Sequence, residues 1–356
     1  MGSKYSKYKI FHFKDKVDSL PKDKEVILPP INIRIKPTNV CLHNCWYCSY
    51  RLEDVQLGQD MVEKDYIPKE KMLEIIDDCE EMGVKAITFS GGGDPFYYKY
   101  LLETIQRLSK SSIKFSSLTN GVMLKGEVAK IFAEYGTWIR ISIDGWDDKS
   151  YSEYRDIKEG EFSKVLQNME NFKKLNGNCA LGVSLVVDNK NYTHVYEIIE
   201  KVYKVGVDSI KVSPCVVSNF GFENNKYHES LHDKVQEQLV MAKKDFESVE
   251  FEIFNSYHFS QNEFDKGYDW CPFMQVLPVI GADLNVYPCH DKAYNLENGL
   301  LGSIKEKSFK DFWMNDKDKF FKINPSKVCK NRCVPDEKNK MIIDYLDVDR
   351  EHLDFL

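Results

Sequence analysis

The sequence of 356 residues contains no uninterrupted apolar stretch of about 20 residues, which a membrane-spanning helix would need. The N-terminal segment is polar and charged, and it holds no apolar run of the kind that directs secretion. An excess of positive charge is also missing, because 49 basic and 56 acidic residues give a formal net charge of −7. A protein that tracks phosphate backbones would carry the opposite balance. We therefore expect a cytoplasmic protein that binds neither DNA nor a membrane.

Cysteine, in contrast, is plentiful, with ten residues in the chain. Disulfides are not expected in a reducing compartment, so clustered cysteines indicate metal binding or catalysis. A first group falls within eight residues and consists of Cys41, Cys45 and Cys48. A second group is spread over the last third of the chain and consists of Cys271, Cys289, Cys329 and Cys333. The other three, Cys79, Cys179 and Cys215, stand alone.

Short apolar runs alternate with amphipathic stretches between about residues 31 and 254. The apolar runs predict six strands, at about 31–37, 85–89, 113–118, 138–143, 180–187 and 208–214. The amphipathic stretches predict helices at about 67–82, 101–108, 127–135, 162–175, 193–203 and 227–246. This alternation is typical of parallel βαβ units, whose right-handed crossovers wrap a sheet into an arc or barrel. The predicted fold class is α/β, with a partial (β/α)6 barrel.

The alternation stops after about residue 256. The sequence there predicts a hairpin around 281–283 and one amphipathic helix at about 308–321. We therefore predict three parts. They are an N-terminal extension over 1–30, the partial barrel over 31–255 and a small C-terminal domain over 256–356.

In α/β folds of this kind, the chemistry sits at the carboxyl ends of the strands. Unusual residues follow five of the six predicted strands. They are the first cysteine group, the turn Gly91–Pro95, the turn Thr119–Gly121, the pair Asp144–Gly145 and the segment Ser213–Cys215. We expect these segments to meet at one end of the barrel.

The first cysteine group has the spacing C-x3-C-x2-C, and its three thiolates can converge on one metal centre. Three ligands are one short of the four that close a 4Fe–4S cluster or a tetrahedral zinc site. A cluster held by three cysteines keeps one iron open to a further ligand. His43 is the alternative fourth ligand, in which case the metal would be zinc.

This spacing, with an aromatic residue before the last cysteine and after the first strand of a βα series, resembles the radical S-adenosylmethionine (SAM) superfamily. The turn Gly91–Gly93 with Asp94 resembles the family's GGE motif, which receives the amino group of SAM, although Asp94 is one methylene shorter than the usual Glu. Arg155 resembles the arginine that pairs with the SAM carboxylate, and an arginine fork suits that group. Further positions that the resemblance places near SAM are Tyr47, Asn120, Ser142, Asp144 and Ser184.

The resemblance implies a mechanism and its cofactors. Cys41, Cys45 and Cys48 would hold a 4Fe–4S cluster, and exchangeable SAM would chelate the open iron. One electron would split SAM into methionine and a 5′-deoxyadenosyl radical, which abstracts a hydrogen atom from the substrate. The cofactor supplies the difficult chemistry, and the protein positions it and excludes water. A reductant such as flavodoxin or ferredoxin is the expected electron donor.

The second cysteine group offers four thiolates, enough to close a 4Fe–4S cluster completely. The segment resembles the SPASM/twitch extension of radical SAM enzymes, with Leu284 where that pattern has a glycine. Four cysteines fit the shorter twitch form with one auxiliary 4Fe–4S cluster, held by Cys271, Cys289, Cys329 and Cys333. Structural zinc is the alternative for the same four residues.

Cys215 follows the sixth predicted strand, near where a substrate would sit. Some radical SAM epimerases use a thiol to return a hydrogen atom to the substrate radical, and Cys215 is the candidate for that role. A buried, inert thiol is the alternative reading. Cys79 falls on the apolar face of its predicted helix, where it is expected to be a core residue.

The main functional prediction is a radical SAM enzyme that oxidises or epimerises a small-molecule or carbohydrate-type substrate. The alternative is a peptide- or protein-modifying maturase that forms thioethers, epimerises residues or matures sulfatases. Only forty residues precede Cys41, which we expect to be too few for the leader-binding domain of many peptide maturases. A non-catalytic iron–sulfur electron carrier is a third possibility, although such a carrier needs no open iron.

Overall fold

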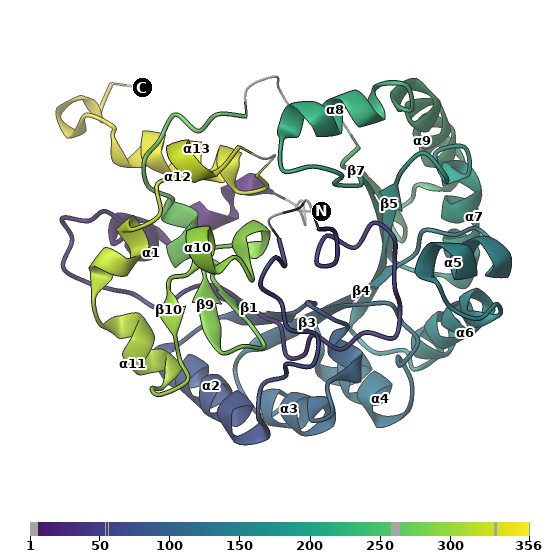
Figure 1. Cartoon of the computed structure of the whole chain (residues 1–356), viewed down its shortest axis with the longest axis horizontal. Coiled ribbons are helices and arrows are strands. Elements are labelled where there is room, and N and C mark those ends of the chain that lie inside the picture. Colours follow the sequence, from purple (N-terminus) through teal and green to yellow (C-terminus); the bar gives the residue numbers. More distant parts are fainter. Residues whose placement is uncertain (1–5, 54, 56, 258–263, 331–332, 356) are drawn as a thin grey trace.

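The computed structural model describes residues 6–53, 55, 57–257, 264–330 and 333–355. A ten-stranded sheet forms its centre, in the order β10–β9–β8–β1–β2–β3–β4–β5–β6–β7. Strands β1 to β7 are parallel neighbours. Figure 1 shows them as an arc with helices around its outside. This arrangement confirms the predicted α/β fold with a partial (β/α) barrel.

The elements have the following bounds. The strands are β1 Asn32–Ile35, β2 Ala86–Phe89, β3 Lys114–Thr119, β4 Trp138–Ser142, β5 Ala180–Val187, β6 Ser209–Pro214, β7 Glu252–Asn255, β8 Val279–Ile280, β9 Asn285–Tyr287 and β10 Gly302–Ser303. The α-helices are α1 Lys14–Asp18, α2 Lys69–Met82, α3 Leu101–Leu108, α4 Gly126–Tyr135, α5 Asp148–Arg155, α6 Glu161–Lys174, α7 Val195–Val205, α8 Gly221–Glu229, α9 His232–Phe246, α10 Leu296–Gly299, α11 Phe309–Met314, α12 Pro325–Val328 and α13 Asp336–Leu346. The 3₁₀ helices are η1 Lys7–His12, η2 Pro95–Tyr97, η3 Pro272–Gln275, η4 His290–Lys292, η5 Lys317–Phe321 and η6 Arg350–His352.

Three elements differ from the sequence prediction. A seventh parallel strand, β7, pairs with β6 and extends the arc by one strand. The helix expected over 227–246 is divided into α8 and α9 at Ser230 and Leu231, although both residues keep nearly helical backbone angles. The helix expected over 308–321 is likewise divided into α11 and η5.

The two faces of the arc have different environments. Residues such as Ile33, Ile87, Phe115 and Ile139 are buried on the outer face, where they pack in the main apolar core. The alternate positions on the strands point to the inner face and are mostly polar and half-buried, as in β1, β4 and β6. The core therefore lies between sheet and helices, and the inner face is left for the site.

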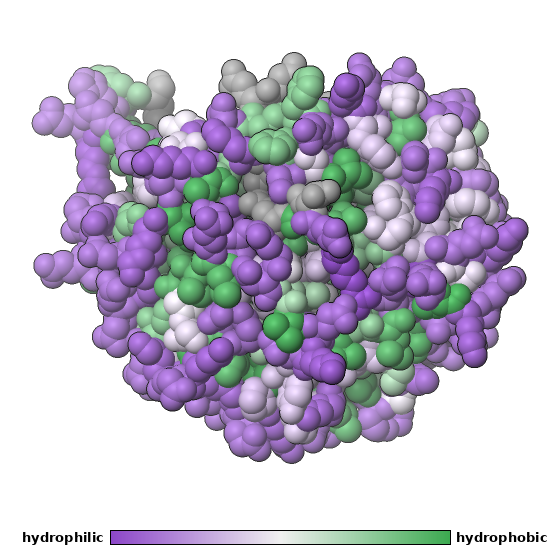
Figure 2. Space-filling model, in the orientation of Figure 1, coloured by the Kyte–Doolittle hydropathy of each residue, from purple (hydrophilic) through white to green (hydrophobic). Residues whose placement is uncertain are grey.

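The C-terminal hairpin continues the same sheet. Strand β8 pairs in parallel with β1, and β9 and β10 follow in antiparallel pairs. The boundary predicted at residue 255 therefore falls within one continuous sheet, and the division into three parts stays a prediction. Among the residues that the structure describes, none of the helices combines the length and apolar character that crossing a bilayer requires. Figure 2 shows a largely hydrophilic face with scattered hydrophobic residues.

Candidate functional site

The first cysteine group lies on the loop that follows β1. Two backbone hydrogen bonds hold this loop against α5, from the Asn44 N–H to the Arg155 carbonyl at 2.8 Å and from the Trp46 N–H to the Tyr154 carbonyl at 3.4 Å. The three thiols are partly exposed. Burial, and then the charge of Asp94, raises the pKa of Cys41 to about 12. A positively charged group such as a metal centre would be needed to stabilise its thiolate.

The donor chemistry of this loop fits an iron–sulfur cluster with one open iron, since three thiols come from eight successive residues. In the described part of the chain, no three His, Cys, Asp or Glu side chains enclose a point as a bound metal ion would require. The zinc alternative through His43 is not supported. Its Nε2 lies 3.0 Å from a Glu161 oxygen and its Nδ1 lies 3.3 Å from Arg155, so both ring nitrogens have partners.

The glycine turn after β2 packs directly on the segment before the first cysteine. The Gly93 N–H donates to the Thr38 carbonyl at 3.1 Å, and the Asp94 N–H donates to the Val40 carbonyl at 3.0 Å. A Cβ at Gly92 would lie 1.9 Å from the Asn39 side-chain oxygen, and one at Gly93 would lie 2.1 Å from the Val40 carbonyl oxygen. The turn needs glycine because the two backbones touch.

The Asp94 carboxylate is buried and joins the turns after β2 and β3. It accepts hydrogen bonds from the Phe96 N–H at 2.8 Å, the Asn120 N–H at 2.6 Å and the Thr119 hydroxyl at 2.9 Å. Burial raises the pKa of Asp94, and these donors oppose the shift. Sequence reasoning placed Asp94 at the SAM amino group and Asn120 near SAM. The structure brings them together through the protein's own hydrogen bonds.

A second buried carboxylate, Asp144, organises the other side of the site. It accepts hydrogen bonds from the Tyr47 hydroxyl and from the Arg155 guanidinium. Arg155 also donates to the Ser142 carbonyl at 2.9 Å. Four residues predicted for SAM binding, Tyr47, Ser142, Asp144 and Arg155, therefore form one contact network between the cysteine loop, β4 and α5.

Several polar groups at this end of the barrel are buried and lack a partner. Ser90 Oγ, Asp144 Oδ1 and Arg155 Nε make no hydrogen bond to any residue that the structure describes. Buried polar atoms normally form hydrogen bonds. This group of unpaired polar atoms is therefore consistent with a polar ligand that would hydrogen-bond them. Ser142 and Ser184 are register partners on β4 and β5 and are half-buried on the inner face. The polar residues present are therefore suited to SAM, and their assignment to it stays a prediction.

The second cysteine group also comes together. Burial, and then the charges of Asp291, Cys271 and Cys329, raises the pKa of Cys289 well above its usual value. Burial, and then the charges of Asp291, Cys289 and Cys271, raises the pKa of Cys333 well above its usual value. Cys289 and Cys333 each respond to two other thiols of the group, which indicates that the four cysteines lie in the same region of the structure. Whether they hold an auxiliary 4Fe–4S cluster or zinc stays a prediction.

A buried lysine that sequence reasoning missed connects the two cysteine regions. The Lys36 ammonium hydrogen-bonds the Tyr50 hydroxyl and the Gly91 carbonyl, and lies 3.5 Å from the Nδ1 atom of His290. The Tyr50 hydroxyl is 3.1 Å from the same nitrogen. Lys36 is fully buried, and a lysine at the end of an apolar strand is the sequence signal that could have identified it.

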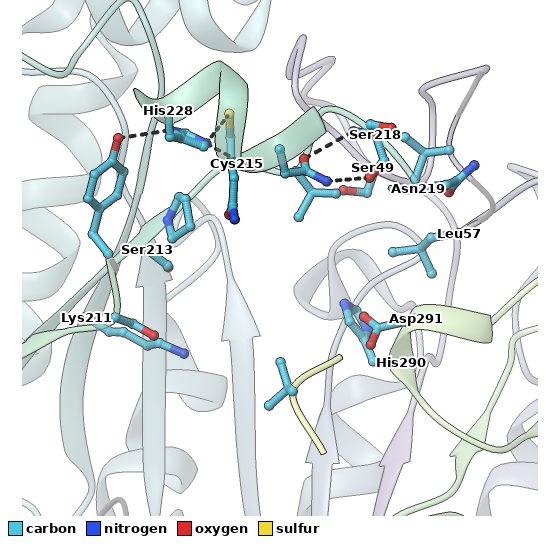
Figure 3. Close-up of a pocket in the computed structure, with 18 of the residues that line it drawn as sticks. Ser49, Leu57, Lys211, Ser213, Cys215, Ser218, Asn219, His228, His290 and Asp291 are labelled. Carbon is cyan, nitrogen blue, oxygen red and sulfur yellow. Dashed lines mark hydrogen bonds between the residues drawn. The ribbon is translucent and has the colours of Figure 1, made fainter. Parts of the chain in front are cut away.

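A cavity with a volume of about 310 Å³ lies at the carboxyl ends of β6 and β7. Ser49 and Leu57 bound it from the cysteine-loop side, and His290 and Asp291 bound it from the C-terminal segment. Figure 3 shows Cys215 and His228 across the cavity from His290 and Asp291. The cavity therefore lies between the barrel and the residues that follow Cys289. Its other polar lining residues are Lys211, Ser213, Ser218, Asn219, Asn224, Asn225, His232, Ser256 and Tyr257.

Cys215 lies at the wall of this cavity, as its predicted position after the sixth strand requires. Its sulfur is 3.7 Å from the Nε2 atom of His228, whose Nδ1 atom is 2.9 Å from the Tyr257 hydroxyl. The residue is 2% exposed, and burial raises the pKa of Cys215 to about 12. The thiol is therefore held in its S–H form. Cys79, by contrast, is packed in the apolar core, as predicted.

Comparison with known proteins gives a family match over the barrel. A model of the Radical SAM superfamily matches residues 35–213 of this chain. An S-adenosylmethionine-dependent nucleotide dehydratase from Lacinutrix mariniflava is 29% identical over 124 residues, which is 35% of this chain and 25% of that protein. The chain thus spans only part of the length of such relatives.

Two other similarities extend over most of the chain. A cysteine-type anaerobic sulfatase-maturating enzyme from Clostridium novyi is 26% identical over 333 residues, 85% of this chain and 84% of that protein. The crystal structure of Streptococcus suis SuiB bound to the precursor peptide SuiA superposes with a TM-score of 0.61 at 17% identity, covering 88% of this chain and 71% of SuiB. The likeness in fold thus continues past the family model into the C-terminal segment.

Proposed function

The chain belongs to the radical SAM superfamily, and from this premise we propose that it is a peptide- or protein-modifying member that abstracts a hydrogen atom from its substrate. Membership makes it an enzyme and implies a 4Fe–4S cluster and SAM. When bound, these cofactors supply a 5′-deoxyadenosyl radical. The remaining work falls to the protein, which must bind the substrate, orient it and keep water away.

The extent of the similarities favours a peptide over a small molecule. The match to the sulfatase-maturating enzyme runs through barrel and C-terminal segment alike, whereas the match to the nucleotide dehydratase covers about a third of the chain. The SuiB structure, which covers 88% of this chain, was solved with a precursor peptide. We therefore prefer the peptide-modifying alternative to the small-molecule or carbohydrate substrate that the sequence first suggested.

The observation that carries the proposal is the position and lining of the cavity beside the cysteine loop. It opens between the barrel and the C-terminal segment, so a chain that passes over the barrel can place one side chain in it. Four serines and three asparagines are among the lining residues, and such groups hydrogen-bond backbone amides as well as side chains. A few polar groups placed in a concave site are typical of substrate pockets.

We assign the cluster to Cys41, Cys45 and Cys48, and the SAM site to the polar groups around them. The carboxylate of Asp94 and the guanidinium of Arg155 already have protein partners, so direct contact with SAM requires them to exchange or share these partners. The remaining SAM-site residues in the assignment are Tyr47, Gly91, Gly92, Gly93, Asn120, Ser142, Asp144 and Ser184.

Cys215 is proposed to return a hydrogen atom to the substrate carbon. In that step the S–H bond breaks, a C–H bond forms, and a thiyl radical stays on the protein. One electron from a flavodoxin- or ferredoxin-type donor and one proton restore the thiol. The raised pKa supports this role, because only the protonated thiol carries a hydrogen atom to give. Cys271, Cys289, Cys329 and Cys333 are the residues that would hold an auxiliary 4Fe–4S cluster, which would supply one-electron chemistry.

The proposal is tested by anaerobic reconstitution followed by assay for 5′-deoxyadenosine. Production of this compound with SAM and dithionite separates an enzyme from an electron carrier. Candidate peptides and nucleotides deuterated at carbon then distinguish the substrate classes. Deuterium that passes from peptides, but not from nucleotides, into 5′-deoxyadenosine supports a peptide-modifying enzyme, and the reverse pattern restores the small-molecule prediction.

A further inference from the structure

The last α-helix, α13, carries a polar residue on its buried face. Asn339 is 0% exposed and lies one turn before Ile342, which is equally buried. Ile342 packs in an apolar cluster with Ile10, Val17, Leu20 and Val276. This packing fixes α13 against the N-terminal segment and the residues that follow Cys271. A buried amide in such surroundings needs hydrogen-bond partners for both its oxygen and its nitrogen.

The Asn339 amide has one orientation that satisfies its partners. Its Oδ1 atom accepts a hydrogen bond at 2.9 Å from the Phe273 N–H, in the first turn of η3. Such a donor has no partner within its own helix. Because the oxygen faces Phe273, the amino group faces the other way. It donates to the Cys271 sulfur at 3.1 Å and to the Tyr268 hydroxyl at 3.3 Å.

A second residue of α13 holds the same segment in place. The Tyr268 hydroxyl donates to the Asp336 carboxylate at 2.7 Å. The charge of Asp336 is paired, because the Lys266 ammonium lies 3.7 Å from one of its oxygens and the Lys340 ammonium lies 3.1 Å from the other. The helix therefore directs a neutral N–H donor, held by protein contacts on both sides, at one sulfur of the second cysteine group.

We propose that Asn339 is a positioning residue that acts through Cys271, and that its N–H···S hydrogen bond raises the reduction potential of the auxiliary 4Fe–4S cluster. The inference rests on the proposed function for the cluster itself. Reduction adds an electron to the cluster, and part of the added negative charge falls on the ligand sulfurs. A donor directed at such a sulfur stabilises the reduced form more than the oxidised form, so the potential rises.

The raised potential has a direction for electron flow. A cluster that is easier to reduce takes an electron more readily from a flavodoxin- or ferredoxin-type donor, and its reduced form is a weaker reductant. Asn339 would thus favour the reduced form of the auxiliary cluster without contacting SAM or the substrate.

The test is a redox titration of the auxiliary cluster alone. Full-length protein with Cys41, Cys45 and Cys48 replaced by Ala is reconstituted anaerobically with iron and sulfide, and reduction is followed by EPR. Asn339→Leu keeps a similar side-chain volume but removes the donor. We expect its equilibrium constant for one-electron reduction to fall about tenfold, which lowers the potential by about 59 mV.

Tyr268→Phe is the matched control. It removes the other acceptor of the same amide but leaves the bond to the Cys271 sulfur, so the equilibrium constant should change by about twofold or less. Protein labelled with ¹⁵N-asparagine adds a signature that a merely structural role would not produce. Pulsed EPR should show a ¹⁵N coupling to the reduced cluster in the unaltered protein and in Tyr268→Phe. Asn339→Leu should lack it.

Asn339→Asp gives the same spectroscopic comparison, because it keeps an acceptor for the Phe273 N–H and lacks the amide nitrogen. Thermal unfolding without iron checks the folding of each variant. An unchanged potential in Asn339→Leu, equal shifts in Asn339→Leu and Tyr268→Phe, or a ¹⁵N coupling that persists without Asn339 would overturn the inference.

Zinc in place of iron at the second cysteine group would also overturn it. None of these outcomes depends on SAM cleavage. Failure of the proposed function appears separately, as absence of 5′-deoxyadenosine in the unaltered protein.

Discussion

The guanidinium of Arg155 hydrogen-bonds the carboxylate of Asp144 inside the barrel, where the two side chains are 3% and 0% exposed. Tyr47 donates to the same carboxylate from the cysteine loop. The pair therefore connects the loop that carries the first cysteine group to β4 and α5. Because both charges are buried, neither can be removed without leaving the other uncompensated.

Arg155→Met should lower the free energy of unfolding by about 3–5 kcal/mol, because the Asp144 charge would remain buried without its partner. Chemical denaturation of the unreconstituted protein measures this loss apart from cofactor binding. The matched control is Lys130→Met, which breaks the exposed pair with Glu127, where the side chains are 61% and 63% exposed. That change should cost less than about 1 kcal/mol. Similar losses for the two variants would contradict the assigned role.

Gly92→Ala tests the contact between the glycine turn and the segment before Cys41. Its Cβ would meet the Asn39 oxygen at 1.9 Å, and that oxygen accepts a hydrogen bond from the Tyr294 hydroxyl at 2.6 Å. We expect a loss of stability of about 1–3 kcal/mol from the displaced side chain. Gly267→Ala is the control, because a Cβ there meets no atom within 4 Å. A tolerated Gly92→Ala would show that the turn can move.

Asp94→Ala should weaken SAM binding about tenfold, because the carboxylate either meets the amino group or fixes the turns that do. Thr119→Val removes only one of its donors and should change the affinity by about twofold or less. Equilibrium dialysis with labelled SAM measures both. If Asp94→Ala kept its full affinity for SAM, the assignment of Asp94 to the SAM site would be wrong.

Cys215→Ala should abolish return of hydrogen from the protein without preventing 5′-deoxyadenosine formation. The pKa of about 12 keeps the thiol protonated across the usual assay range, so the step should not weaken between pH 7 and about 9. Turnover in D₂O places solvent deuterium in the product of the unaltered protein. Unchanged deuterium content in the variant would assign the transfer to another group.

The two cysteine groups should contribute independently to iron content. Reconstituted protein is expected to hold about eight irons, and replacement of Cys41, Cys45 and Cys48 by Ala should leave about four. Replacement of Cys271 and Cys289 by Ala should remove the other four. Elemental analysis with Mössbauer spectra gives the counts and cluster types. Zinc bound at the second group would instead support the structural-zinc alternative.

The sequence alone was sufficient to predict the order of strands and helices in the barrel and the unusual residues that follow its strands. The run 180–187 coincides with β5 because every outward position is apolar. The sequence could not predict contacts between segments distant in the chain, such as Lys36 with His290. These contacts depend on how the hairpin docks on β1. It also missed β7, which has only four residues and little periodicity.

Hairpin docking has a consequence for how the chain can be shortened. Strand β8 hydrogen-bonds the backbone groups on the edge of β1 that faces away from β2. One such bond runs from the Arg34 N–H to the Pro278 carbonyl at 3.0 Å. A fragment that stops before the hairpin would present these donors and acceptors as an open edge. Such edges recruit strands from other molecules, so a truncated barrel would be expected to aggregate rather than remain monomeric.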